Sequence, residues 1–189
     1  MAQRTKSGDG RRNSQSSAPN PLAEAWTTPF QIPPFDRIKV ADFLPAFDKG
    51  FAQHRREIAA IVRDRQPATF ANAIDALERS GELLNRISAV FFNLAATDTN
   101  EEIQAIERAL APRFAKHRMR IYQDTTLFGR VQGLFKTRRR LKLSQEQACV
   151  LERYHRAFIN AGAGLPTKAK KRMAAIAARM SVLGHQGPR

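Results

Sequence analysis

The stretch from Phe70 to Thr97 constrains the fold of this chain more strongly than any other. Its apolar and small residues recur at alternating steps of four and three, which places them on one side of a helix. These residues are Phe70, Ile74, Leu77, Gly81, Leu84, Ser88, Phe91 and Ala95. In the second half a further apolar stripe lies beside the first, formed by Leu83, Ile87, Val90 and Leu94. One partner helix cannot cover a face this wide, so we expect the stretch at the centre of the fold, with helices on two sides.

Thr69 and Gly81 mark the start and the middle of this stretch. The hydroxyl of Thr69 can accept a hydrogen bond from a first-turn amide, which predicts an N-cap there. A glycine inside a helix costs about 1 kcal/mol relative to alanine. Gly81 therefore indicates either a kink or a close helix crossing.

Other segments of the chain also show helical periodicity, and no segment alternates with the period of a strand. They cover residues of about 41–63, 101–122, 126–138 and 145–160, followed by a last helix from about Pro166. Their predicted core-facing residues, in chain order, are Leu44, Phe47, Phe51, Ile58, Ile61, Ile103, Ile106, Leu110, Phe114, Ile121, Leu127, Val131, Leu134, Phe135, Ala148, Leu151, Phe158, Gly162, Ala169, Met173, Ile176, Met180 and Leu183. The predicted fold class is all-α, an antiparallel helical region.

Two local signals refine the helices. Ser144 to Gln147 fits a capping box, which predicts a helix start at that point. Pro112 lies inside the helix of about 101–122 and is expected to bend it.

The residues before the helical body, which is expected at 41–184, divide into two parts. Residues 1–19 are rich in Ser, Gly, Gln and Arg, a composition that predicts a disordered basic tail. Residues 20–40 contain several prolines, which forbid a continuous helix, together with Trp26, Phe30 and Phe35. We predict an extended arm that lays these rings into grooves of the helices.

The formal net charge of +15 is unevenly distributed. Residues 1–19 carry +3, residues 20–107 carry −4 and residues 108–189 carry +16. A basic half of this size attracts polyanions nonspecifically.

No apolar run approaches the roughly 20 residues of a membrane span, no secretory signal is recognisable, and one cysteine excludes an internal disulfide. The expected location is cytoplasmic, without a membrane partner.

Three of the four histidines, His54, His117 and His155, lie on predicted core-facing stripes. One interpretation is an interhelical metal site. The other is packing among core side chains with local hydrogen bonds, and it is favoured because no two histidines share a helix at metal-ligand spacing. No H-E-x-x-H, glycine-rich phosphate loop, cysteine pair or G-x-S-x-G is present. The sequence therefore predicts no catalytic, cofactor-binding or metal-binding residue in this chain.

Two basic runs allow either nucleic-acid contact or the solvated ends of helices. They consist of Lys136, Arg138, Arg139, Arg140 and Lys142, and of Lys168, Lys170, Lys171 and Arg172. A platform for base stacking would interleave aromatic residues with these charges, whereas Phe128, Phe135 and Phe158 lie on core-facing stripes. Nucleic-acid binding is therefore the weaker interpretation.

The sulfur-containing side chains have ordinary packing roles in this interpretation. Cys149 lies just inside an apolar face, and without a histidine neighbour it is expected to be an inert packing thiol. Met173 and Met180 are expected in the core rather than on a partner-binding surface.

Several segments, taken in order, carry a family resemblance. They are NPL at 20–22, WTTPF at 26–30, PPFDRIK at 33–39, FLPAFD at 43–48, TFANAIDALERSG at 69–81, VFFNLAATDTN at 90–100, IQAIERALAP at 103–112, LERYHRAFINAGAGL at 151–165 and KKRMAAIAARMSVLG at 170–184. The ordered set resembles the N-terminal region of the thimet-oligopeptidase family of zinc metallopeptidases, in its bacterial oligopeptidase A and peptidyl-dipeptidase branch. The resemblance covers about residues 20 to 184.

The resemblance implies a large, almost wholly helical enzyme whose two halves enclose a channel that admits only short peptides. In that family the histidines of H-E-x-x-H and a downstream Glu hold a zinc ion, which activates a water molecule. This motif does not occur among the 189 residues, so no zinc or other cofactor is expected in this chain. The chain is expected to supply part of the channel wall and to be inactive alone.

The last residues, 185–189, depart from the family pattern after Gly184, which suggests a frameshift or a premature stop. The first hypothesis is a truncated fragment of a peptidase that hydrolyses short oligopeptides. Two alternatives stay open. In the first alternative, the chain is the non-catalytic half of a split peptidase, which a separately encoded catalytic half completes. In the second, it is a basic helical module that binds nucleic acid or an acidic partner.

Overall fold

The computed structural model of this chain describes residues 19–166, 168–170, 172 and 175–176. All regular structure within these ranges is helical, as predicted. The α-helices are α1 (Phe43–Arg63), α2 (Ala76–Arg79), α3 (Glu82–Thr97), α4 (Glu101–Tyr122), α5 (Thr125–Thr137) and α6 (Gln145–Asn160). Short helical turns are η1 (Pro29–Gln31), η2 (Val40–Asp42), the π-helical η3 (Phe70–Asp75) and η4 (Arg138–Arg140).

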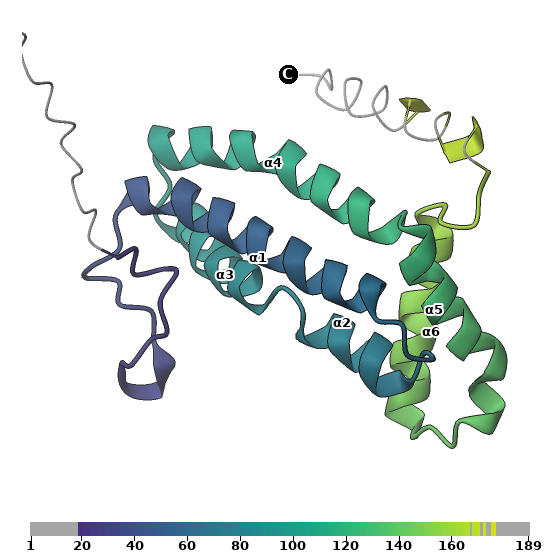
Figure 1. The fold of residues 1–189 in the computed structure, drawn as a ribbon. Helices are drawn as coiled ribbons and strands as arrows, with labels where there is room; N and C mark the ends of the chain where they lie inside the picture. Colours follow the sequence, from purple (N-terminus) through teal and green to yellow (C-terminus); the bar gives the residue numbers. More distant parts are fainter. Residues whose placement is uncertain (1–18, 167, 171, 173–174, 177–189) are drawn as a thin grey trace, which may run out of the picture.

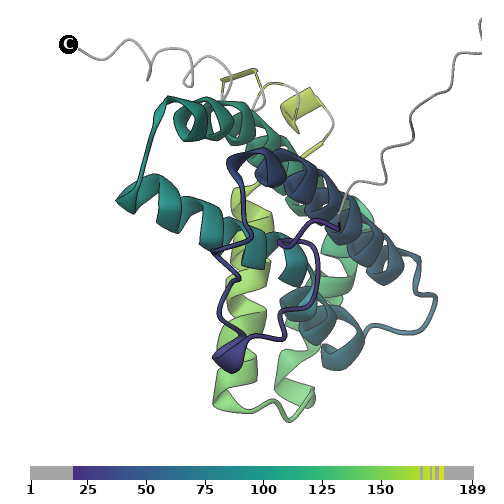
Figure 2. The same ribbon diagram turned by 90° about the vertical axis from the view of Figure 1, so that its left-hand side faces the viewer.

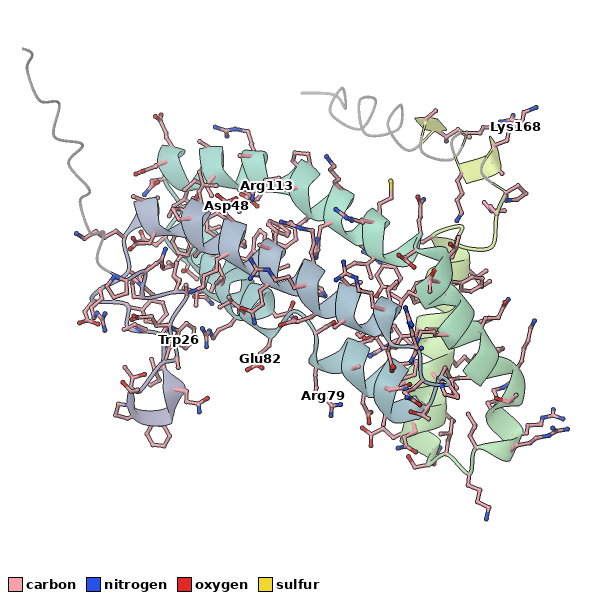
Figure 3. The ribbon with its side chains drawn as sticks, viewed as in Figure 1. Trp26, Asp48, Arg79, Glu82, Arg113 and Lys168 are labelled. Carbon is pink, nitrogen blue, oxygen red and sulfur yellow. The ribbon has the colours of Figure 1, made fainter. Side chains whose placement is uncertain are left out.

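The helices form two groups that meet end to end (Figure 1). At one end α1 packs along α3, and α4 covers both. At the other end α5 packs along α6, and both contact the segment formed by η3 and α2. Asp48 of α1 and Arg113 of α4 form an ion pair that joins the first group across its surface (Figure 3).

Each group has its own buried apolar cluster. The first is formed by Leu22, Phe43, Ala46, Phe47, Phe51, Leu83, Leu84, Ile87, Val90, Phe91, Ile103, Ile106 and Leu110. The second is formed by Ile58, Ile61, Ala73, Ile74, Leu77, Leu127, Phe128, Val131, Leu134, Leu151, Phe158 and Ala163. Because α1 contributes its first half to one cluster and its second half to the other, it connects the two groups.

The stretch 70–97 is central, as predicted, but it is not one helix. Its start is capped by the Thr69 hydroxyl, which accepts a hydrogen bond from the Asn72 amide, and this prediction is confirmed. The helix breaks at Gly81, whose φ of 78° lies in the left-handed region that favours glycine. A Cβ atom at this position would lie 2.8 Å from the ring of His54. Gly81 therefore marks both a break and a close crossing, the two alternatives that its sequence context left open.

The arm only partly confirms its prediction. Leu22 is fully buried, and Trp26 packs against the first cluster while its Nε1 donates to the carbonyl of Pro21 at 2.9 Å. Phe30, however, is 95% exposed and Phe35 is about half exposed, so the expectation that all three rings lie in grooves is wrong. The reason is η1, a tight turn that holds Phe30 at the tip of a loop projecting away from the helices (Figures 1 and 2).

Three predicted positions within the described helices are also wrong. Leu44 is exposed because the buried line of α1 passes through Phe43 and Phe47, which leaves Leu44 to one side. Ala148 and Cys149 are exposed because α6 is covered mainly by α5, so its buried stripe is narrower than the sequence suggested. The thiol is therefore not a packing group.

Some predictions concern residues beyond those that the structure describes. They include the basic tail at 1–18, the core role of Met173, Met180 and Leu183, and the divergent end at 185–189. Of the predicted last helix, Lys168 to Lys170, Arg172 and residues 175–176 are helical, and Ile176 is about half exposed.

Candidate functional site

Three polar side chains meet where α2 gives way to α3. His54 comes from α1, His117 from α4 and Ser80 from the break itself. His117 Nε2 lies 3.0 Å from His54 Nδ1, and His54 Nε2 lies 3.2 Å from Ser80 Oγ. Since the Ser80 hydroxyl donates to the carbonyl of Leu77 at 2.7 Å, it must accept from His54 Nε2–H. His54 Nδ1 is then the acceptor for His117 Nε2–H.

Both histidines favour the neutral state. Burial lowers the pKa of His54, and the nearby Glu57 carboxylate only partly opposes that effect. Burial, together with the smaller effects of His54, Arg55 and Arg120, lowers the pKa of His117 to about 4. A second proton on His54 would place an N–H against the N–H of His117. The hydrogen-bond chain and the electrostatics thus agree on two uncharged rings at neutral pH.

The backbone break is tied to α1 beside the histidine pair. The amide of Gly81 donates to Glu57 Oε2 at 2.7 Å, and the other carboxylate oxygen of Glu57 accepts from Gln53 Nε2 at 2.9 Å. One turn earlier on α1, the ring of His54 occupies the space that a Cβ atom at position 81 would need. Two consecutive turns of α1 therefore hold the break in place.

A groove of about 830 Å³ lies between the second half of α4 and α6. Its lining includes the half-buried Tyr122 and Ala157 and the exposed Met119 and Cys149. Arg118 along it lies over the ring of Tyr122, and the other charged side chains of its lining are paired. Arg153 lies 2.7 Å from Glu78, and Arg156 lies 2.6 Å from Glu152.

A smaller hollow of about 310 Å³ shares Tyr122 with this groove, and its lining includes His54, Ser80 and Tyr154. Burial raises the pKa of the Tyr154 phenol, and Glu78 raises it further. Besides the Glu78 carboxylate, which is paired with Arg153, the hollow presents the protonated phenol of Tyr154, the neutral ring of His54 and the hydroxyl of Ser80. Such a surface suits the polar backbone of a peptide or of a neighbouring helix better than a charged reactant.

His155 lies apart from the other two histidines. Its ring stacks on Phe135 with centroids 3.9 Å apart, and Arg138 lies 4.0 Å from the centroid of the same ring. Two planar groups at this distance must occupy opposite faces of Phe135. The ring of Phe135 is therefore unavailable to a nucleobase. The basic residues among 136–142 are nevertheless exposed.

The described residues do not fit a zinc site. Among them, no group of three histidine, cysteine, aspartate or glutamate side chains is placed to hold an ion. The two histidines that do meet use their facing nitrogens for a bond to each other, and the remaining nitrogen of His54 bonds to Ser80. We therefore assign no metal-dependent step to this part of the chain.

Sequence reasoning placed His54 and His117 on core-facing stripes but did not pair them. They lie 63 residues apart, and only the packing of α1 against α4 brings them together. It missed Ser80 and Glu57 as partners of the break. The one available signal was Gly81, whose unfavourable position inside a helical pattern pointed to a special backbone conformation.

Comparison with curated proteins shows which sequences this chain resembles. Dipeptidyl carboxypeptidase of Salmonella typhimurium is 38% identical over 167 residues, which is 88% of this chain and 25% of that protein. The Escherichia coli enzyme of the same name is 37% identical over 167 residues. Oligopeptidase A of Escherichia coli is 28% identical over 174 residues. The resemblance to the thimet-oligopeptidase family is confirmed.

The match has clear limits of extent. The chain spans about a quarter of the length of the curated relatives it matches. No family model matches it. In the part of the chain that the structure describes, no helix combines the length and the apolar character needed to cross a bilayer.

Proposed function

We propose that this chain forms part of the wall of a peptidase that hydrolyses short oligopeptides, and that alone it does not cleave peptide bonds. The observation that carries the proposal is the similarity to dipeptidyl carboxypeptidase over 88% of the chain. The helical fold and the hydrogen-bonding groups of His54, Ser80 and Tyr154 that line the smaller hollow support it, because a wall that admits peptides needs shape and hydrogen-bonding groups rather than reactive ones. In full-length members of the family, zinc would supply the chemistry through residues that are not among these 189.

A chimera tests the wall role directly. The segment of Salmonella dipeptidyl carboxypeptidase that matches this chain is replaced by residues 20–184, and cleavage of a short quenched-fluorescence peptide is measured. We expect the chimera to retain zinc and measurable activity that EDTA abolishes. A folded, zinc-loaded chimera without activity would contradict the wall role.

The isolated chain provides the second measurement. With added zinc and the same peptide, we expect no cleavage above the buffer control, since the chain lacks H-E-x-x-H. Zinc-dependent turnover by the purified 189 residues would refute the proposal that it is inactive alone. The same preparation, mixed with a separately produced catalytic part, tests the split-peptidase form of the proposal by recovery of activity.

The exposed basic residues 136–142 favour one other function, the electrostatic docking of an acidic partner or nucleic acid. The occupied faces of Phe135 argue against base stacking. Docking of this kind predicts binding that falls steeply with salt and shows little preference for sequence. Binding to one RNA or DNA sequence that survives physiological salt would instead favour a dedicated nucleic-acid module.

A further inference from the structure

A third hollow lies between α1 and α4 and has no role in the proposed function. Its volume is about 230 Å³. Arg55 and Arg63 of α1 and Arg120 of α4 form its charged wall. Ile58 and Val62 are apolar residues of the same lining, and the three arginines are exposed.

Some arginines of the described chain form ion pairs, and others, including these three, do not. Arg113, Arg130, Arg153 and Arg156 each meet a carboxylate. In the described part of the chain, no carboxylate lies within ion-pair distance of Arg55, Arg63 or Arg120. Three like charges around one small hollow repel one another, so the arrangement is most stable when an anion lies between them.

The other titratable groups at the hollow do not cancel this charge. Asp124 lines it, but its Oδ1 accepts a hydrogen bond from the Leu127 amide as the N-cap of α5. His117 also lines it and is neutral at pH 7. Glu57 lies on the same helix as Arg55, but its carboxylate oxygens are bonded to Gly81 and Gln53. With three arginines and one aspartate, the lining carries a formal charge of +2.

We propose that this hollow binds a doubly charged oxyanion of the phosphate type, held by the guanidinium groups of Arg55, Arg63 and Arg120. A guanidinium presents its N–H donors in a planar fork that matches two oxygens of one phosphate group. The charge of +2 on the lining balances the charge of such an anion. The bound species is inorganic phosphate or the phosphate group of a larger molecule, and both share this chemistry.

His117 provides a readout inside the site. Its pKa is lowered first by burial, then by His54, and then by Arg55 and Arg120. An anion between these arginines offsets their field, so binding raises the pKa of His117. The effect reports occupancy of this hollow and not of other basic surfaces of the chain.

The experiment is an NMR titration of the full chain with sodium phosphate, against sodium chloride at matched ionic strength. We expect saturable shifts of the His117 ring signals and a higher His117 pKa. Replacing Arg120 by Gln removes charge-assisted hydrogen bonds and weakens binding about tenfold. Arg120→Lys keeps the net charge but loses the fork, and we expect it to weaken binding too. Arg139→Gln removes the same charge from an exposed position in the basic run and is expected to leave the affinity within about twofold.

Each opposite result overturns the proposal. If R139Q weakens binding as much as R120Q, the anion senses only the overall charge of the chain. If R120K binds like the unaltered chain, no built geometry holds the anion. Absence of saturable binding at millimolar phosphate, or equal binding of acetate, refutes a phosphate-type site. Parallel titrations with phosphoserine and pyrophosphate distinguish a free ion from a phosphate carried by a larger molecule through their relative affinities. Circular dichroism confirms that each exposed substitution leaves the fold intact.

Discussion

Replacing Gly81 by alanine tests how the centre of the fold is held together. Gly81 has a φ of 78°, and an alanine there adopts a left-handed conformation at a cost of about 1–2 kcal/mol. The loss of glycine's freedom in the unfolded chain returns about 0.4–1 kcal/mol. The added Cβ lies 2.8 Å from two atoms of the His54 ring, which His117 and Ser80 hold from either side. Overpacking of such a site costs about 1–3 kcal/mol.

The expected net result is a loss of about 2–3 kcal/mol in the free energy of unfolding. In urea this shifts the midpoint of unfolding down by about 1–2 M, since slopes for small proteins are about 1–3 kcal/mol per M. The chain offers matched controls in Gly129 and Gly133. Both lie inside α5, and a Cβ at either position meets nothing within 4 Å. The same substitution to alanine there is expected to stabilise the protein by up to about 1 kcal/mol.

A double-mutant cycle separates the two causes of the loss. His54→Ala removes the ring that a Cβ at position 81 would strike, so the clash disappears while the backbone cost remains. We therefore expect the double variant G81A/H54A to be more stable than the sum of the single effects predicts, by about 1–3 kcal/mol. If G81A unfolds at the same urea concentration as G133A, the reasoning from backbone angle and contact distance is refuted.

Three other outcomes follow from the same contacts. Because the pKa of His117 is about 4 in the folded protein and 6.5 for an unperturbed histidine, the unfolded state binds more protons between these values. The contribution of His117 to stability is then fully present above about pH 6.5 and is lost as the pH falls towards 4. Allowing for solvent screening of this half-buried ring, we expect a loss of about 1–2 kcal/mol. Urea unfolding at pH 7 and pH 5 measures this loss, with H117Q as the control. Arg130→Ala removes a side chain that is 10% exposed and binds Asp64, and it should lower the free energy of unfolding by about 2–3 kcal/mol. Arg156→Ala removes an exposed side chain and should lower it by under about 0.5 kcal/mol. Equal losses in thermal unfolding would contradict the role of burial. Leu151→Ala changes the second cluster, whereas the fluorescence of Trp26 reports on the first. If the two clusters unfold together, the substitution should lower the unfolding midpoint measured by Trp26 fluorescence as much as the midpoint measured by circular dichroism.

The sequence determined the helices well because their signals are local. Glu101 to Tyr122 is helical from end to end as predicted, since the Asn100 side chain caps it and its apolar residues repeat at helical spacing. Ser144 likewise caps α6 through the predicted capping box. Such features depend on residues three or four positions apart, which a reading along the chain can see.

The candidate site could not be predicted in the same way because its contacts are distant in sequence. Periodicity shows that His54 and His117 face inward, but not that they face each other. It also cannot show how much of a face is covered, and this is why Leu44 and Cys149 were wrongly placed in the core. The aromatic composition of the arm correctly predicted that Trp26 packs against the body, but Phe30 follows the local geometry of its turn.

The two apolar clusters are expected to behave as one cooperative unit although they contain different residues. α1 supplies Phe47 and Phe51 to the first cluster and Ile58 and Ile61 to the second, so melting one cluster frees half of a helix on which the other depends. The break at Gly81 works in the same direction. Since the broken stretch would otherwise let η3 and α2 move apart from α3, the bonds from α1 to both sides of the break restore the coupling. A flexible backbone position is thus made rigid by its neighbours, and the junction between the clusters is the place where a single added methyl group should be felt by both.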